Sequence, residues 1–267
     1  MQPDYTTIKK TVGLLLRMFL LIILFSTPLI VKFIIRKNAA FSAFDIDYLI
    51  VVNLLAQIWL ILYISGHTQE NREKPDKRKG TKKRVVSLLP FVITGTIALI
   101  FLIDPLQQLI PVSPRVESFF RKMMEVKTLP VIYIVLLGPI VEEVMCRGII
   151  LHGFLKNYQP LKAILFSSLL FAMIHFFLLN QFVLTFILGC FTGFVYWQTG
   201  SLFLCMIIHI LNNSFGLIST DLFGFGKSIE TGINSTPLFL GLYLTAALLF
   251  FFSLLLIYRK NTPIDPG

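Results

Sequence analysis

Charged residues are scarce in this chain of 267 residues. Asp, Glu, Lys and Arg together make up 14% of it, against roughly 25% in soluble domains. Intrinsic disorder and nucleic-acid binding both require many more charges, so neither describes the chain as a whole. Apolar residues reach 55%, 26 residues are phenylalanine, and the mean hydropathy is +0.78. This composition argues against a water-soluble fold and predicts a membrane protein.

Cysteine is scarce too, and two common catalytic motifs are absent. The three cysteines, Cys146, Cys190 and Cys205, are an odd number and lie inside apolar runs. A disulfide framework is therefore excluded, and we expect small buried apolar side chains at these positions. The chain contains neither the HExxH zinc motif nor the GxSxG serine motif, so it lacks the usual signatures of those two hydrolase classes.

Long apolar runs dominate what is present. They are continuous rather than alternating, which indicates helices and not a transmembrane β-barrel. The fold class predicted is all-α, a polytopic membrane helix bundle with about eight transmembrane helices. The expected spans are 11–35, 46–65, 85–103, 129–155, 161–179, 182–197, 201–218 and 237–257. Pro139 lies inside the long fourth span, where its missing backbone donor predicts a kink.

The spans suggest three regions along the chain. Residues 1–128 would form an N-terminal membrane region of three helices with a basic loop and a candidate interfacial helix around 116–126. Residues 129–218 would form the helical core that carries the chemistry. Residues 219–267 would contribute a loop, the last transmembrane helix and a tail.

The loop from His67 to Arg84 is the strongest indicator of sidedness. It holds eight Lys and Arg residues and three acidic residues. Basic loops favour the cytoplasm, so we place this loop there. Eight spans would then put both termini in the cytoplasm of a multi-pass protein of the cell membrane. Membrane lipids are expected partners, and the loop has a second reading as a site for anionic lipid.

Ionisable residues at membrane depth are costly and usually functional. The fourth span places Glu142, Glu143 and Arg147 in the middle of an apolar helix. Glu143 and Arg147 are four residues apart, so they share a face and are expected to pair. Glu142 lies about 100° around the helix from Glu143. A carboxylate in such a site suits a general base or acid.

Histidine and asparagine side chains lie in two further spans. His175 is in the fifth, while His209 and Asn213 lie one turn apart in the seventh. Taken alone, His175 is also explained as a structural histidine. Together with Glu142 the set would form a polar pocket able to hold a water. The carboxylate would accept the water's proton, and the imidazole and amide groups would stabilise an oxyanion, which is what peptide hydrolysis requires.

The same side chains have a second chemical reading. Two histidines and one carboxylate are a known catalytic zinc set, which here would be Glu142, His175 and His209. The residues alone leave metal dependence open.

At these positions the chain resembles the CPBP family of intramembrane proteases, which includes CAAX proteases and bacteriocin-processing (Abi) proteins. The family's motifs are matched by Glu142-Glu143 with Arg147, by Phe171 with His175, and by His209 with Asn213. The resemblance covers about 138–216. One departure is Cys146, where many members carry an aromatic residue. We expect it to alter packing or substrate fit and not the chemistry.

The resemblance implies a role for each matched residue. Glu142 would activate the water with the help of His175, while His209 and Asn213 would form the oxyanion site. Glu143, Arg147 and Phe171 would be supporting motif residues. The family has been described both as metalloproteases and as glutamate-dependent proteases. We favour a metal-independent mechanism, with no cofactor, and keep a divalent metal such as zinc as the alternative.

The function predicted is an intramembrane endopeptidase for membrane-associated protein or peptide substrates. The resemblance implies CAAX-type processing, or bacteriocin maturation or immunity. Two other classes stay open: a non-catalytic immunity or partner-binding membrane protein on the same scaffold, and a proton-coupled transporter. The complete Glu/His/His/Asn set argues against the former. The lack of visible internal repeats argues against the latter.

Overall fold

The structure is a computed structural model. It describes residues 8–35, 42–67, 82–108, 117–118, 121, 129–175, 179–224, 227, 229–233 and 236–260. Every regular element in these ranges is helical. Seven of the described helical stretches are long and apolar enough to cross a membrane. Helices suit this environment because they satisfy their backbone hydrogen bonds internally, where lipid offers no partners.

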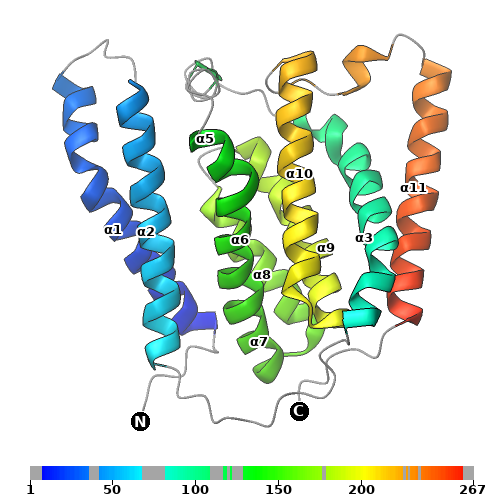
Figure 1. The fold of residues 1–267 in the computed structure, drawn as a ribbon, viewed down its shortest axis with the longest axis horizontal. Helices are drawn as coiled ribbons and strands as arrows, with labels where there is room; N and C mark the ends of the chain where they lie inside the picture. Colours follow the sequence, from blue (N-terminus) through cyan, green and yellow to red (C-terminus); the bar gives the residue numbers. More distant parts are fainter. Residues whose placement is uncertain are drawn as a thin grey trace. The chain divides into compact units, whose positions relative to one another are not determined.

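The chain forms two compact units. The first comprises residues 1–70 and 113–154. It contains α1 (Ile8–Ile35), α2 (Ala43–His67), α5 (Leu129–Ile132), the π-helical turn η2 (Tyr133–Leu137), α6 (Gly138–Glu143) and the π-helical segment η3 (Val144–Leu151). Helix α1 packs along α2 (Figure 1), and α2 also packs against α5, α6 and η3. Helix α2 is therefore the neighbour of the segment that carries Glu142.

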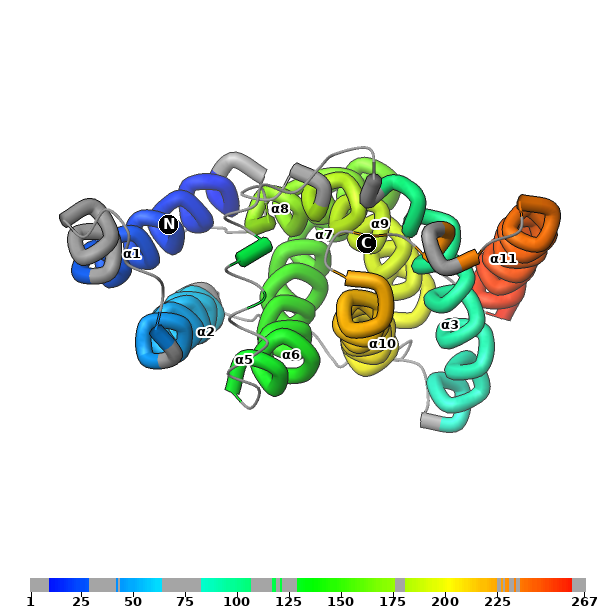
Figure 2. Tube along the Cα trace, turned by 90° about the horizontal axis from the view of Figure 1, so that it is seen from above, coloured from blue at the N-terminus to red at the C-terminus, as the bar shows by residue number. Residues whose placement is uncertain are grey.

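The second unit comprises residues 71–112 and 155–267. It contains α3 (Lys82–Ile103), the 3₁₀ turn η1 (Asp104–Gln108), α8 (Pro160–Ile174), α9 (Leu179–Thr199), α10 (Leu202–Phe223), the 3₁₀ turn η4 (Ile229–Gly232) and α11 (Thr236–Arg259). Helix α7 (His152–Asn157) joins the two units. Within the second unit α3 packs against α10 and α11, and α8 packs against α9 (Figure 2).

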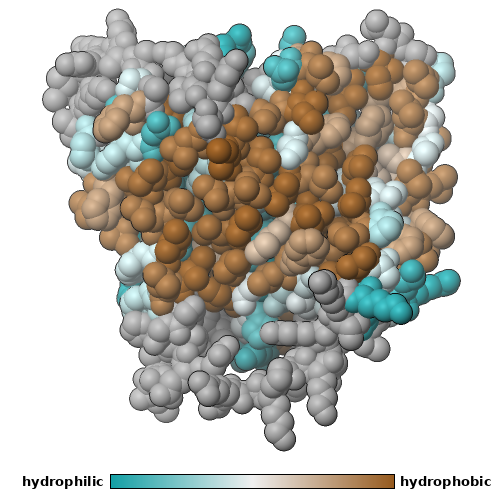
Figure 3. Space-filling view, viewed as in Figure 1, coloured by the Kyte–Doolittle hydropathy of each residue, from teal (hydrophilic) through white to brown (hydrophobic). Residues whose placement is uncertain are grey.

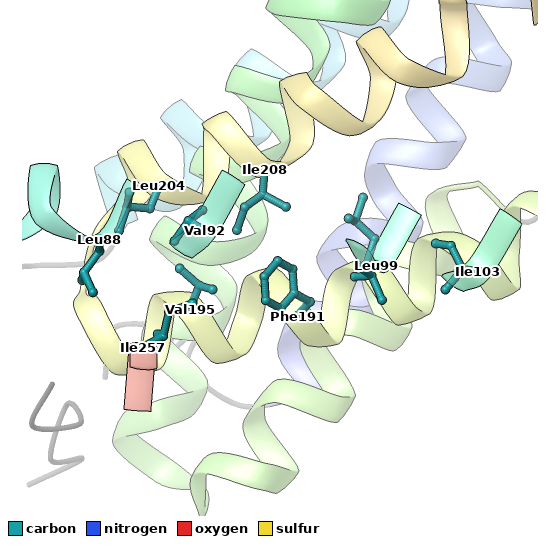
Figure 4. Close-up of a cluster of buried hydrophobic side chains, with 10 residues drawn as sticks. Leu88, Val92, Leu99, Ile103, Phe191, Val195, Leu204, Ile208 and Ile257 are labelled. Carbon is teal, nitrogen blue, oxygen red and sulfur yellow. The ribbon is translucent and has the colours of Figure 1, made fainter. Parts of the chain in front are cut away.

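A continuous apolar core holds the second unit together. Side chains from α3, α9, α10 and α11 meet there (Figure 4), and the buried members are Leu88, Val92, Leu99, Ile103, Leu188, Phe191, Val195, Leu204, Ile208 and Ile257. This cluster fixes the position of α10, the helix that carries His209 and Asn213.

Small residues allow two of these helix pairs to approach closely. A Cβ atom on Gly95 of α3 would lie 3.1 Å from the Cβ of Ser253 on α11. A Cβ atom on Gly189 of α9 would lie 3.0 Å from the Cβ of Ser168 on α8. Glycine lets backbones pack at this distance in membranes, where dispersion contacts drive helix association.

A tight turn joins α9 to α10. Gly200 has a φ of 63°, a left-handed conformation that favours glycine. Ser201 follows as the N-cap of α10 and accepts a hydrogen bond from the Leu204 amide at 3.3 Å. The sequence Thr199-Gly200-Ser201-Leu202 thus ends one helix and starts the next within three residues, which sets the register of His209.

The exposed helix faces are strongly apolar. Figure 3 shows apolar side chains over much of the visible surface. On α11, the exposed residues include Leu244, Leu248, Phe251 and Phe252. Such a surface would be unfavourable in water and matches the interior of a bilayer.

The predicted spans correspond to observed helices, with one difference. The expected fifth span, 161–179, is represented by α8, which has 15 residues and ends at Ile174. A transmembrane helix needs about 20 residues, so α8 is shorter than a full span. At its end the His175 amide donates to the Ala172 carbonyl at 2.9 Å, and Nδ1 of His175 lies 3.2 Å from the Phe171 carbonyl oxygen.

Two predicted features lie outside the described residues. These are most of the basic loop between α2 and α3, and most of the candidate interfacial helix around 116–126. The division of the chain at 128 and 218 stays a prediction.

Candidate active site

The helix that carries Glu142 departs from regular α geometry on both sides of it. The turn η2 precedes α6, and η3 follows Glu143 directly. Pro139, at the start of α6, has no backbone N–H and so leaves one α-helical bond unmade. The neighbouring Gly138 amide instead bonds to the Tyr133 carbonyl, five residues back. π-Helical turns inside α-helices are rare and occur frequently at functional sites.

Both glutamates of this helix are buried. Glu142 is 8% exposed and Glu143 0%. Arg147 Nη1 donates to Glu143 Oε1 at 3.0 Å, which confirms the predicted pair. Arginine therefore balances the charge of Glu143 directly, whereas Glu142 projects from a different part of the helix surface. Cys146, also buried, behaves as the small apolar filler expected there.

The second unit brings Phe171 together with both predicted histidines. The Phe171 ring is fully buried. Its centroid lies 5.4 Å from the His175 ring and 5.4 Å from the His209 ring, at interplanar angles of 70° and 87°. Both imidazoles meet the phenyl ring in edge-on contacts, a favoured aromatic geometry. Phe171 therefore acts as a spacer that fixes the two imidazoles from α8 and α10.

The surroundings of His175 favour one tautomer. Its Nδ1 lies 3.2 Å from the Phe171 carbonyl oxygen, and a carbonyl can only accept a hydrogen bond. The contact therefore places the proton of a neutral imidazole on Nδ1 and makes Nε2 the acceptor nitrogen. An acceptor nitrogen is suited to orient a water molecule.

Two asparagines sit side by side near the middle of α10. Asn212 Nδ2 donates to Asn213 Oδ1 at 3.1 Å. Because the oxygen of the Asn213 amide faces Asn212, its Nδ2 carries the hydrogens that are directed elsewhere. Asn213 lies one turn after His209, which is 3% exposed, so the two side chains belong to neighbouring turns of α10.

A pocket of about 90 Å³ adjoins Asn212. It lies among α3, η1, α9 and α10, and its polar lining includes Asp104, Gln181, Thr185, Asn212, Ser219 and Lys227. Its volume matches about three water molecules. The pocket therefore brings a polar space next to Asn212.

The candidate residues are divided between the two units. Glu142, Glu143 and Arg147 belong to the first, and Phe171, His175, His209 and Asn213 belong to the second. Among the described residues, no group of three or more His, Cys, Asp or Glu side chains is arranged to hold a metal ion. The alternative zinc set of Glu142, His175 and His209 has one member in the first unit and two in the second.

Sequence reasoning missed several polar residues near these side chains. Asn53 and Gln57 lie four residues apart in α2, and Tyr133 lies in η2. In the second unit it missed Asn212. Amides and a phenol at membrane depth are a usable signal, although weaker than ionisable groups, because an unpaired polar group in lipid is also costly.

The fold and these side chains define a polytopic helical membrane protein with a buried carboxylate in one unit and an imidazole and amide cluster in the other. Residues 125–215 match the family model described as type II CAAX prenyl endopeptidase Rce1-like. This match confirms the resemblance seen in the sequence and supports a CAAX-type intramembrane protease. No curated protein and no solved structure matches the chain.

Proposed function

We propose that this chain is an endopeptidase in which Glu142 activates a water molecule. The observation that carries the proposal is the burial of Glu142, which is 8% exposed, in the middle of a membrane-spanning helix and within the matched segment 125–215. A carboxylate is costly at that depth, and such a residue is functional by default. A carboxylate there is a suitable general base.

In the proposed reaction Glu142 accepts a proton from the water. The resulting hydroxide attacks the carbonyl carbon of the scissile peptide bond, and the carbonyl oxygen becomes an oxyanion. His209 and Asn213 donate hydrogen bonds to that oxyanion. Glu142 then returns its proton to the leaving nitrogen as the C–N bond breaks. One water is consumed, and an acid and an amine are released.

Local geometry in the second unit supports the roles of its residues. The Phe171 carbonyl contact makes Nε2 of His175 an acceptor, which suits it to hold the water. The Asn212 contact turns the oxygen of Asn213 away from the proposed oxyanion, so that the amide hydrogens serve as donors. The polar pocket beside Asn212, the residue that contacts Asn213, offers room for water along α10.

We propose that the reaction needs no metal. Carboxylate, imidazole and amide groups together supply the base and the oxyanion donors. Should zinc be bound instead, Glu142, His175 and His209 would hold it, and it would polarise the substrate carbonyl and the water.

For the substrate we propose membrane-associated proteins or peptides of the CAAX type, because the matched family model carries that description. For the topology we propose that both termini and the basic loop face the cytoplasm. Cysteines introduced into 75–80 and into 228–232 should then be labelled from opposite sides. Labelling of both from one side would contradict this topology.

The decisive experiment uses the full chain purified in detergent. A peptide library that includes substrates with and without a prenylated C-terminal cysteine is incubated with it, and cleavage products are identified by mass spectrometry. We expect hydrolysis by the parent and none by Glu142→Gln, with Lys162→Gln as a matched control that changes a charged side chain near the start of α8. If a folded parent cleaves no member of the library, the proposed activity is wrong for these substrates.

A further inference from the structure

Helix α2 carries two polar side chains that contact each other, and it belongs to the same unit as Glu142. This helix precedes the matched segment 125–215 in the chain. Gln57 is 1% exposed, and its Nε2 donates to Asn53 Oδ1 at 2.8 Å. A buried amide in a membrane-spanning helix is costly, so the pair calls for an explanation beyond packing.

Gln57 also interacts with the phenol of Tyr133. Its Oε1 is buried and has no hydrogen-bond partner among the described residues, so Nε2 is the atom of Gln57 that would donate to the phenol. That nitrogen carries two hydrogens, enough for both Asn53 and Tyr133. With Gln57 as donor the phenol oxygen of Tyr133 would accept, which would leave its O–H hydrogen able to donate to a further group.

The Glu142 carboxylate lies next to Tyr133. A Cβ atom on Gly138 would lie 3.7 Å from Tyr133 Cζ and 3.8 Å from Glu142 Oε1. The phenol and the carboxylate thus border the same small space, which the absence of a side chain at Gly138 keeps open. The two groups also interact electrostatically.

The π-helical turn explains how Tyr133 reaches this place. Residues 133 and 142 are nine apart, which is about two and a half turns of a regular α-helix and puts them on opposite faces. The turn η2, with its hydrogen bonds to the fifth residue, absorbs part of that rotation. It therefore moves Tyr133 toward the face of Glu142.

We propose that Tyr133 is a positioning residue for Glu142. Its hydroxyl donates a hydrogen bond to the carboxylate, while Gln57, itself held by Asn53, orients the phenol. One carboxylate oxygen is thereby fixed, and the other is directed at the water. This inference deepens the proposed function and rests on it, and it extends the site to α2.

Tyr133→Phe tests the proposal, because it removes the hydroxyl and keeps the ring. We expect kcat to fall about 10- to 100-fold with KM unchanged, the effect of losing one hydrogen bond to a charged group. Tyr243→Phe is the matched control, since the Tyr243 hydroxyl donates to the Leu102 carbonyl at 3.0 Å in the second unit. It should leave kcat at the parental value.

Gln57→Leu gives an independent arm. Gln57 acts through the phenol, so adding Gln57→Leu to Tyr133→Phe should lower kcat no further. If the two substitutions lowered kcat by fully additive amounts, Gln57 and Tyr133 would act separately, and the proposal that Gln57 acts through Tyr133 would be overturned. A Tyr133→Phe variant that turns over at the parental rate, beside an inactive Glu142→Gln, would overturn the inference and leave the proposed function intact.

Infrared difference spectroscopy tests the contact between Tyr133 and the Glu142 carboxylate without measuring turnover. The carboxyl band that Glu142→Gln removes should be displaced in Tyr133→Phe and unchanged in Tyr243→Phe. If Tyr133→Phe does not fold, the same band is followed in Gln57→Leu. An unchanged band overturns the inference whatever the activity. A displaced band in a protein whose parent is inactive would show that the contact exists and that the proposed function is wrong. Tyr133 would then have no positioning role in catalysis.

Discussion

Arg147 Nη1 lies 3.0 Å from Glu143 Oε1, and each of the two side chains is only 1% exposed. A buried ion pair of this kind contributes little net stability, but removing one partner leaves the other as an uncompensated buried charge. We therefore expect Arg147→Met to lower the free energy of unfolding by about 3–5 kcal/mol. Thermal denaturation of the purified protein in detergent measures this.

The double variant Glu143→Leu/Arg147→Met is the control for that prediction. Replacing both charges by apolar groups is often close to neutral, so the double variant should be more stable than Arg147→Met alone. Equal losses in the two would mean that the pair is not the reason for the effect.

Substitutions of the two adjacent glutamates should affect different properties, turnover for Glu142 and stability for Glu143. Glu142→Gln keeps the size of the side chain and removes the proposed base, so turnover should vanish while the melting temperature stays near the parental value. Glu143→Gln leaves Arg147 without a charged partner and should lower the melting temperature first. Steady-state turnover and thermal melts of both variants test this, and parental turnover by Glu142→Gln would refute the assignment of the base.

The oxyanion donors on α10 should act on turnover rather than on binding. Removal of one such donor typically costs about 10²–10³ in kcat, so His209→Ala and Asn213→Ala should each lose that much with little change in KM. His175→Ala should lose at least as much, because it also disturbs the water. Losses that appear in KM, with kcat at the parental value, would argue against oxyanion donors on α10.

Metal removal distinguishes the two mechanisms. In the metal-independent reaction a chelator leaves the folded enzyme active, and the purified protein contains far less than one zinc per chain. Metal analysis and turnover are measured on the same sample. Stoichiometric zinc, together with inactivation by chelator that added zinc reverses, would replace the proposed mechanism by one in which Glu142, His175 and His209 are ligands.

The helices were predictable because lipid restricts what a chain can do. An apolar run of about 20 residues has one stable conformation in a bilayer, so composition and length alone located the spans. The end of α8 was not predictable in this way, since the sequence continues apolar beyond it. At that end the ring of His175 contacts the Phe171 carbonyl, a local hydrogen bond that hydropathy does not encode.

The candidate site was predictable where spacing along one helix decides the contact. Glu143 and Arg147 are four residues apart, and helical geometry brings them together. The position of Phe171 between two imidazoles depends instead on how α8 and α10 pack, which no periodicity reveals. The position of Tyr133 near Glu142 was not predictable for a further reason, because it depends on the π-helical turn that rotates Tyr133 toward Glu142.

The short helix α8 has a consequence for the surrounding lipid. Its 15 residues measure about 22 Å, against a hydrocarbon thickness of about 30 Å. A stripe of exposed apolar side chains, Leu161, Leu165, Leu169 and Met173, runs along it. Membranes accommodate a helix shorter than their hydrocarbon thickness by local thinning. His175 lies at the end of α8, so thinning there would shorten the distance that interfacial water must travel to reach it.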